Sequence, residues 1–276
     1  MNIDVNTKLI GRFHTQASPR GLNIYNPYFE EAGINAVYLL FYNTDPKVLV
    51  NGFRALNLAG AITAGFESNE ELPGLLDEVD DSAKFIGRIG YITNENGKLV
   101  GHAQGGQGML RTIKSITSLE NKTLVVVGTG NIAKGLFFAI EQEGINCSVK
   151  LFNRTESKAQ ELKNSFSFID SVGSLENLRE VDGDIFVNLT DIGGSVNDYS
   201  YSSDIISKFE YIVDVTFEVE ETPLVKTARE LNKKIATGWD MFTFQGQVCL
   251  EALTGQSVDP KMLRKHVVNG LSETVK

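Results

Sequence analysis

The chain has 276 residues, of which 42% are hydrophobic, and a formal net charge of −9 with three histidines and two cysteines. The length allows two modest domains of roughly 100–200 residues each, the acidic balance argues against a nucleic-acid-binding surface, and no segment approaches the roughly 18 apolar residues of a membrane helix. The cysteines and histidines lack metal-ligand spacing and the N-terminus lacks a secretory pattern, so we expect a reduced, cytoplasmic protein without a metal site.

The N-terminal third alternates strand-like and helix-like segments. Apolar runs predict strands at 8–13, 35–42 and 60–63, periodicity predicts helices at 27–33, 45–58 and 68–79, and Asn96-Gly97 predicts a β-hairpin over 87–102. The helix at 27–33 has Pro27 first and Gly33 last, which are typical start and stop signals. Ser68 and Glu71 have the spacing of a capping box, so the third helix is predicted to begin at Ser68.

The remaining chain predicts a parallel sheet. Apolar runs that alternate with helical patterns lie at 122–127, 147–155, 184–190, 211–217 and 233–238, and two helices follow at 241–255 and 260–270. This alternation is typical of βαβ units in a doubly wound sheet. We therefore predict an α/β protein with an N-terminal α/β substrate domain (1–109 with 240–276) and a doubly wound, Rossmann-type domain (110–239).

A glycine-rich turn follows the first strand of the predicted sheet and opens a helix. Its residues are Gly128, Thr129, Gly130, Asn131, Ile132 and Ala133, a G-x-G-x-x-A pattern. In this strand–turn–helix context, Gly128 would make the tight turn, Gly130 would let a pyrophosphate approach, and Ala133 would let helix and strand pack closely. A glycine-rich turn without a ligand is the alternative interpretation.

The end of the next strand indicates which dinucleotide binds. Enzymes that use NAD usually carry an acidic residue there, whereas this chain has Asn153, Arg154 and Thr155, with Lys158 one turn later. A guanidinium can stack on adenine and bind a 2′-phosphate with two hydrogen bonds. NADP(H) is therefore the predicted cofactor; the alternative is that Arg154 is only a solvated charge at a helix start.

Several segments together resemble the shikimate dehydrogenase family over nearly the whole chain. They are "VVVGTGNIAKG", "FNRTESKAQEL", "NLTDIGG", "VDVTFEVEETPLVKTARELNKK", "GWDMFTFQGQVCLEALTG" and, near the N-terminus, "YNPYFEEAGINAVYLLF". The resemblance implies an NADP-dependent dehydrogenase with its substrate in a cleft between the two domains. It also implies cofactor contacts for Thr190 and Met241 and substrate contacts for Asn26 and Gln245.

The substrate side departs from the family pattern. The position of the family's catalytic lysine holds Glu67, within a motif that keeps Thr63 and Phe66. Gly105 stands where the family's aspartate is expected, after Ala103 and Gln104. The paired serines that hold the substrate carboxylate in the family fall on Gln16 and Ser18 in one alignment and on Arg12 and His14 in another.

Other groups are candidates to replace the missing ones. Glu67, Tyr91 and His102 are the catalytic candidates, and Arg12, His14, Ser18, Asn26, Thr63, Gln104 and Gln245 are the substrate-binding candidates. A carboxylate at position 67 would stabilise a cationic reaction centre such as an iminium, an imidazole titrates near neutrality, and a guanidinium binds carboxylates. The alternatives are that Glu67 is a first-turn helix acid and that the loop residues are only surface residues.

Three hypotheses follow. The leading one is an NADP(H)-dependent oxidoreductase acting on a small carbonyl, alcohol or imine substrate other than shikimate. The second is a catalytically silent NADP-binding protein, and the third is a shikimate dehydrogenase with relocated acid and base groups. A small molecule is the expected partner, with no nucleic acid or membrane, and a homodimer is a further hypothesis.

Overall fold

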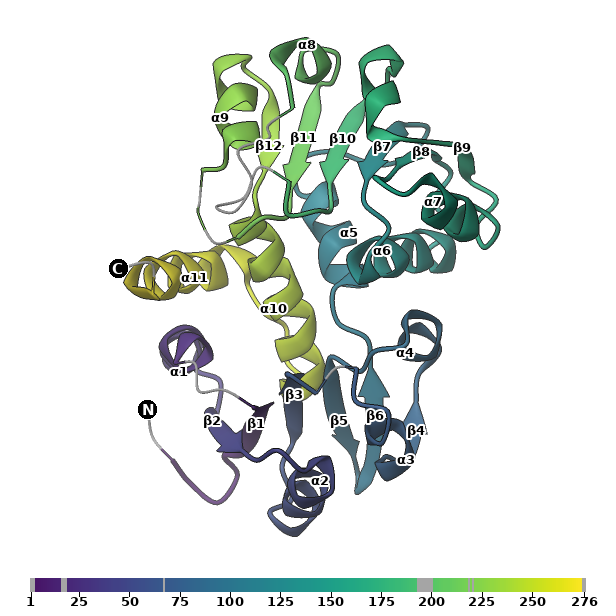
Figure 1. Cartoon of the computed structure of the whole chain (residues 1–276). Helices are drawn as coiled ribbons and strands as arrows, with labels where there is room; N and C mark the ends of the chain where they lie inside the picture. The colour runs from purple at the N-terminus through teal and green to yellow at the C-terminus, as the bar shows by residue number, and fades with distance from the viewer. Residues whose placement is uncertain are drawn as a thin grey trace. The chain divides into compact units, whose positions relative to one another are not determined.

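The computed structural model describes residues 3–15, 19–66, 68–192, 201–217, 219 and 221–274, with side chains up to Ser272. The chain forms two compact units, the first from Met1–Gln104 with Gln245–Lys276 and the second from Gly105–Phe244 (Figure 1). Each unit contains one six-stranded sheet with helices, which confirms the predicted α/β fold class. Among the described residues, no helix is both long enough and apolar enough to cross a lipid bilayer.

The sheet of the first unit is mixed. Its strands are β1 (Lys8–His14), β2 (Ala36–Tyr42), β3 (Gly60–Ala64), β4 (Glu78–Val79), β5 (Tyr91–Glu95) and β6 (Lys98–His102), in the order β2-β1-β3-β5-β6-β4. The first three are parallel, and β5 runs antiparallel to both β3 and β6. The carboxyl ends of β1, β3 and β6 therefore lie at the same edge as the start of β5.

Two sets of helices cover the two faces of this sheet. The face that carries Phe13 packs in one apolar cluster with α2 (Pro46–Ala55), α3 (Leu72–Leu75) and α4 (Asp81–Ile86). On the face that carries Ile10, α1 (Arg20–Ala32) contacts β2 and α11 (Pro260–Thr274), and Leu253 of α10 (Gly238–Thr254) contacts Gly60. The contact is so close that a Cβ on Gly60 would lie 2.1 Å from Leu253 Cδ2, so this strand needs glycine to accept α10.

The sheet of the second unit is entirely parallel and doubly wound. Its strands are β7 (Thr123–Val127), β8 (Ser148–Phe152), β9 (Ile169–Gly173), β10 (Ile185–Asn188), β11 (Tyr211–Asp214) and β12 (Lys234–Ala236), in the order β12-β11-β10-β7-β8-β9. The helices around it are α5 (Gly106–Lys114), α6 (Asn131–Gln142), α7 (Glu156–Lys163), η1 (Leu175–Glu180), α8 (Ser203–Ile206) and α9 (Pro223–Glu230). Strand order reverses between β7 and β10, which is where dinucleotides bind in such sheets.

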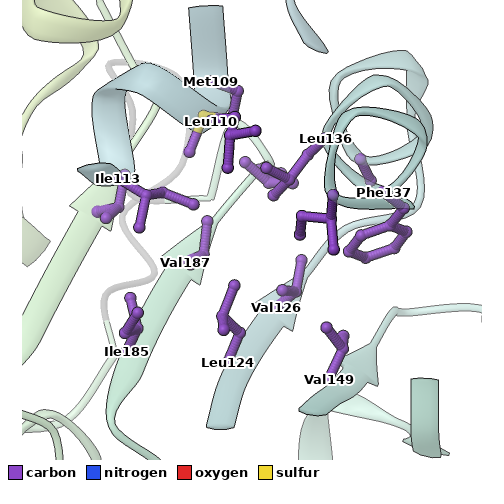
Figure 2. Close-up of a cluster of buried hydrophobic side chains, with 14 of the residues drawn as sticks. Met109, Leu110, Ile113, Leu124, Val126, Leu136, Phe137, Val149, Ile185 and Val187 are labelled. Carbon is purple, nitrogen blue, oxygen red and sulfur yellow. The ribbon is translucent and has the colours of Figure 1, made fainter. Parts of the chain in front are cut away.

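The core of the second unit shows why these segments form this fold. Figure 2 shows side chains of α5 and α6, among them Leu110 and Leu136, lying over those of β7 and β10, among them Val126 and Val187. The strands are apolar on both faces because helices cover both, which explains the continuous apolar runs in the sequence.

Several predicted element boundaries were wrong. α1 begins at Arg20, so Pro27 lies inside it, because the buried Ile24 and Tyr25 stabilise the earlier turns despite the hydrogen bond that proline removes. The predicted capping box at Ser68 does not form. Proline is tolerated only in the first turn of a helix, so Pro73 makes α3 begin at Leu72. Asn69 Oδ1 accepts hydrogen bonds from the N–H groups of residues 71 and 72 instead.

Two strands were not predicted. Glu78–Val79, which the sequence assigned to the helix at 68–79, form the short strand β4. The edge strand β9 escaped prediction because its exposed positions are polar and only its ends are buried. The hairpin is confirmed, with Asn96 and Gly97 both at positive φ between β5 and β6.

Candidate active site

The glycine turn of the second unit is tightly packed at its first glycine and open at its second. Gly128 follows β7 with φ of +110°, and a Cβ there would lie 2.8 Å from Thr190 Cγ2 and 3.0 Å from the Leu189 carbonyl oxygen. Gly130 caps α6 with φ of −73°, and a Cβ on it would meet no atom within 4 Å. No side chain caps the α6 N-terminus, so its N–H groups and positive dipole are available to an anion.

The other residues of the turn follow the expected pattern. Ala133 is fully buried where α6 meets the sheet, and Thr129, Asn131 and Ile132 are half-buried. Thr190 is half-buried beside Gly128, at the switch point of the sheet. Met241 is different: its side chain is 7% exposed and belongs to the apolar core of the second unit.

The end of β8 carries exposed basic side chains. Arg154 and Lys158 are both exposed, and Asn153 Nδ2 donates to the Thr155 carbonyl at 2.9 Å, which orders the turn between β8 and α7. Thr155 begins α7 without a side-chain cap. These residues fit a 2′-phosphate, because two cations and an uncapped helix start would all stabilise a dianion.

A buried polar network, which no pattern in the sequence predicts, lies behind the switch point. Asp214, at the end of β11, is fully buried and accepts hydrogen bonds from Asn188 Nδ2 at 3.0 Å and Thr222 Oγ1 at 2.5 Å. Burial raises the pKa of this carboxyl group, and these hydrogen bonds oppose the increase. A lone Asp at the end of an apolar run gives no local sign that it will be buried.

In the first unit, three predicted site residues share one face of the sheet. Arg12 pairs with Ile62, Ile62 pairs with Tyr91, and Tyr91 pairs with His102, so the four form one row across β1, β3, β5 and β6. Residues in register point to the same face. The rings of Tyr91 and His102 stack with centroids 4.8 Å apart and an interplanar angle of 19°.

His102 is held from both sides. Its Nδ1 lies 2.7 Å from Asp80 Oδ2, and its Nε2 lies 2.8 Å from Thr93 Oγ1. Asp80 also accepts hydrogen bonds from Ser82 Oγ and the Ala83 N–H, which begin α4. Because both ring nitrogens are occupied within the protein, these contacts favour a structural role for His102 over direct proton transfer to a substrate.

Three buried polar atoms on this face make no hydrogen bond in the structure: Arg12 Nε, His14 Nδ1 and Tyr38 Oη. Tyr38 is fully buried and His14 is 5% exposed. Burial raises the pKa of Tyr38, and the charge of the nearby Arg12 opposes the increase. Arg12 is half-buried, and no described acidic side chain pairs with it, so this side of the sheet could receive an anionic group.

Replacing Arg12 with methionine is expected to raise the free energy of unfolding by about 1 kcal/mol, because no acidic side chain of the described residues offsets the desolvation of this half-buried cation and methionine keeps the apolar stem. Urea unfolding of the ligand-free protein measures this change. Arg12→Lys keeps the charge and should show no gain. A loss of stability in Arg12→Met would mean that the guanidinium has a partner in solution.

The remaining substrate-binding candidates differ in how their polar groups are used. Thr63 is fully buried and its hydroxyl donates to the Ile89 carbonyl, which favours a structural role over the predicted contact with a substrate. Asn26 exchanges two hydrogen bonds with the Tyr38 main chain, at 2.7 and 3.0 Å, which fastens α1 to β2. Such an amide has little capacity left for a substrate.

Two glutamines complete the set. Gln104 is half-buried, and its Nε2 donates to Cys249 Sγ of α10 at 3.4 Å. Gln245 lies one helical turn before Cys249 and is half-buried. Glu67 and Ser18 lie outside the described residues. Within the described ranges, no three His, Cys, Asp or Glu side chains are grouped as metal ligands would be.

Comparison with known proteins identifies the family. No protein-family model matches the chain. The shikimate dehydrogenase (NADP(+)) of Aquifex aeolicus is 33% identical over 248 residues, which is 88% of this chain and 89% of that protein. A crystal structure of a shikimate dehydrogenase in complex with NADP+ has a TM-score of 0.80 at 25% identity, covering 98% of each chain.

The fold extends to an enzyme named for a different compound. The 5-ketofructose reductase of Gluconobacter sp. strain CHM43 has a TM-score of 0.78 at 22% identity, covering 96% of this chain and 99% of that one. At this identity the likeness concerns the fold alone. The similarity to the Aquifex enzyme extends over nearly the whole of both chains, and the chain described here therefore belongs to the shikimate dehydrogenase family.

Proposed function

We propose that this member of an NADP-dependent oxidoreductase family transfers hydride to or from a small carbonyl, alcohol or imine compound other than shikimate. The observation that carries the proposal is the contrast between its two halves. The second unit has a glycine turn, an uncapped helix start and exposed basic side chains that would suit a dinucleotide, whereas Gly105, at the position of the family's catalytic aspartate, has no side chain and a φ of +108°. A backbone at this φ strongly favours glycine.

Each part of the cofactor has a proposed partner in the second unit. The relatives are named as NADP(+)-dependent enzymes, which supports NADP(H) as the cofactor. Gly128 and Gly130 would admit the pyrophosphate to the α6 N-terminus, and Arg154 with Lys158 would hold the 2′-phosphate. Bound there, the nicotinamide supplies or accepts the hydride, and the chain's own residues bind, orient and exclude water.

The residues predicted to contact the substrate favour reduction of an iminium over oxidation of an alcohol. Oxidation of an alcohol needs a base for the hydroxyl proton, and the lysine position holds Glu67 instead. Reduction of an iminium needs only hydride at carbon, and a nearby carboxylate stabilises its positive charge before transfer. Arg12 would hold an anionic group of the substrate, and Tyr91 or Glu67 would be the remaining acid or base.

The cofactor assignment is tested by replacing Arg154 with glutamine. We expect NADPH to bind about 10–100-fold more weakly, because the exposed guanidinium is the main partner of the 2′-phosphate, while NADH affinity stays unchanged. Fluorescence titration of the reduced nicotinamide measures both constants. The control is Lys163→Gln at the far end of α7, whose ammonium donates to the Asp170 carbonyl. An equal loss of affinity for NADPH and NADH, or no loss of affinity for either, would contradict the role of Arg154.

The activity itself is tested by following NADPH oxidation at 340 nm with panels of carbonyl compounds and cyclic imines, and NADP+ reduction with shikimate. Turnover of a panel compound and none of shikimate is the expected result. NADPH binding without turnover of any compound would favour the alternative of a catalytically silent binding protein, which the missing lysine and aspartate also support. Turnover of shikimate as fast as by the enzymes named shikimate dehydrogenases would overturn the proposal of a different substrate.

A further inference from the structure

Asp214 is a buried acid that no basic side chain neutralises among the described residues. It is fully buried at the end of β11, and its Oδ1 accepts hydrogen bonds from Asn188 Nδ2 at 3.0 Å and the Thr216 N–H at 3.3 Å. Its Oδ2 accepts the Thr222 hydroxyl at 2.5 Å. Buried polar groups of this kind rarely add stability over apolar residues of equal volume, and a network of them instead imposes a geometric requirement on the side chains that it binds.

The requirement lies at Asn188, the fully buried last residue of β10. Besides donating to Asp214, its Nδ2 donates to the Ile192 carbonyl at 3.1 Å. Its Oδ1 accepts the hydroxyls of Thr190 at 2.6 Å and Tyr201 at 3.1 Å. One side chain, oriented by Asp214, therefore holds both Thr190 and Ile192 of the loop that follows β10.

This loop forms one wall of the predicted cofactor crevice. The Leu189 carbonyl and the Thr190 methyl group are the atoms that a Cβ on Gly128 would meet, at 3.0 and 2.8 Å. Strand order is β8-β7-β10, so the loop after β10 lies on the opposite side of the glycine turn from Arg154, which follows β8. If Arg154 holds the adenine half of the dinucleotide, the loop after β10 adjoins the nicotinamide half.

We propose that Asp214 and Asn188 are positioning residues for the nicotinamide half of the cofactor. Their hydrogen bonds hold residues 189–192 at the distance from the glycine turn that the dinucleotide needs. Neither residue touches the cofactor; both act through Thr190 and the Leu189 main chain. The inference rests on the proposed function, because it requires that NADP(H) binds at this edge of the sheet.

The test compares two ligands and two substitutions. Asp214→Leu removes all three accepted hydrogen bonds, whereas Asp214→Asn keeps the shape and can still accept at Oδ1 and donate to the Thr222 hydroxyl. NADPH carries both halves of the cofactor, and adenosine 2′,5′-bisphosphate carries only the adenine half. Asp214→Leu should bind NADPH about tenfold more weakly and the bisphosphate within about twofold of wild type, and Asp214→Asn should restore NADPH affinity.

The outcomes separate the two proposals. Equal weakening of both ligands in Asp214→Leu would mean general destabilisation and would overturn the positioning role, as would unchanged NADPH affinity. Failure of the wild-type protein to bind either ligand would instead refute the proposed function, and the inference with it. If Asp214→Leu does not fold, Thr222→Val and Thr222→Ser replace it: valine, which cannot donate to Asp214, should reproduce the NADPH-specific loss, and serine should not.

Discussion

Replacing Gly128 with alanine is expected to lower both the stability and the NADPH affinity of the protein. The φ of +110° disfavours any residue with a Cβ, and the new methyl group would lie 2.8 Å from Thr190 Cγ2. Backbone strain and overpacking together should lower the free energy of unfolding by about 3 kcal/mol. NADPH affinity should fall on the order of 100-fold, because the strained turn can no longer receive the pyrophosphate.

Gly130→Ala is the matched control for this prediction. Gly130 has a φ of −73° and no atom within 4 Å of its would-be Cβ, so the substitution should change the free energy of unfolding by less than about 1 kcal/mol. Its methyl group would nevertheless occupy the space where the pyrophosphate approaches, so NADPH affinity should fall in both variants. Urea unfolding and fluorescence titration measure the two quantities. Equal stability of the two variants would show that the contact between Gly128 and Thr190 is not as tight as described.

The second large effect concerns the contact between Asp80 and His102. Asp80→Ala removes both the partner of His102 Nδ1 and the cap of α4, and should lower the free energy of unfolding by about 2–3 kcal/mol. Asp80→Asn keeps an acceptor for the Ala83 N–H, so its free energy of unfolding should fall less than that of Asp80→Ala. Asp81→Ala, one residue away and exposed, is the control for general effects of removing an acid. A loss no greater than that of Asp81→Ala would contradict the structural role of this contact.

The contribution of Asp80 should depend on pH in a specific direction. Burial alone would raise its pKa, but hydrogen bonds from His102, Ser82 and the Ala83 N–H together lower it. A carboxyl group whose pKa is lower in the folded state stabilises the protein above its unfolded pKa of about 3.9, and this stabilisation is lost as pH falls through the folded value. The stability difference between wild type and Asp80→Asn should therefore be constant near neutrality and shrink below about pH 4. A difference that grows on acidification would contradict the direction of the shift.

The parts of the fold that were predicted correctly depend on local patterns. The run "TLVVV", the glycine turn and the amphipathic segment after it are contiguous, so their periodicity and turn residues specify β7 and α6 without knowledge of the rest. Asn96-Gly97 similarly specifies its hairpin. The start of α1 was missed because burial of residues before Pro27, a tertiary effect, outweighed the local stop signal.

In the candidate site of the first unit, the contacts of the polar side chains depend on residues that are distant in the sequence. Tyr91 and His102 were chosen by position in a resembling family, and the sequence offered no reason to connect His102 with Asp80, which is 22 residues away. That contact uses one ring nitrogen of His102 and Thr93 uses the other, which changes the expected role of the residue. Thr63 likewise reads as a ligand-facing hydroxyl until its bond to the Ile89 carbonyl is seen.

By itself, the sequence determined the doubly wound domain, the family and the cofactor, because each is encoded in residues that are neighbours along the chain. Only the tertiary structure decided which polar side chains are available to a ligand. Asn188 and Asp214 are 26 residues apart, yet each satisfies the other in the core, while no acidic side chain among the described residues pairs with Arg12. A hydrogen bond forms over about 3 Å of space and not over sequence, so whether a polar group is occupied or available depends on which strands the fold brings together.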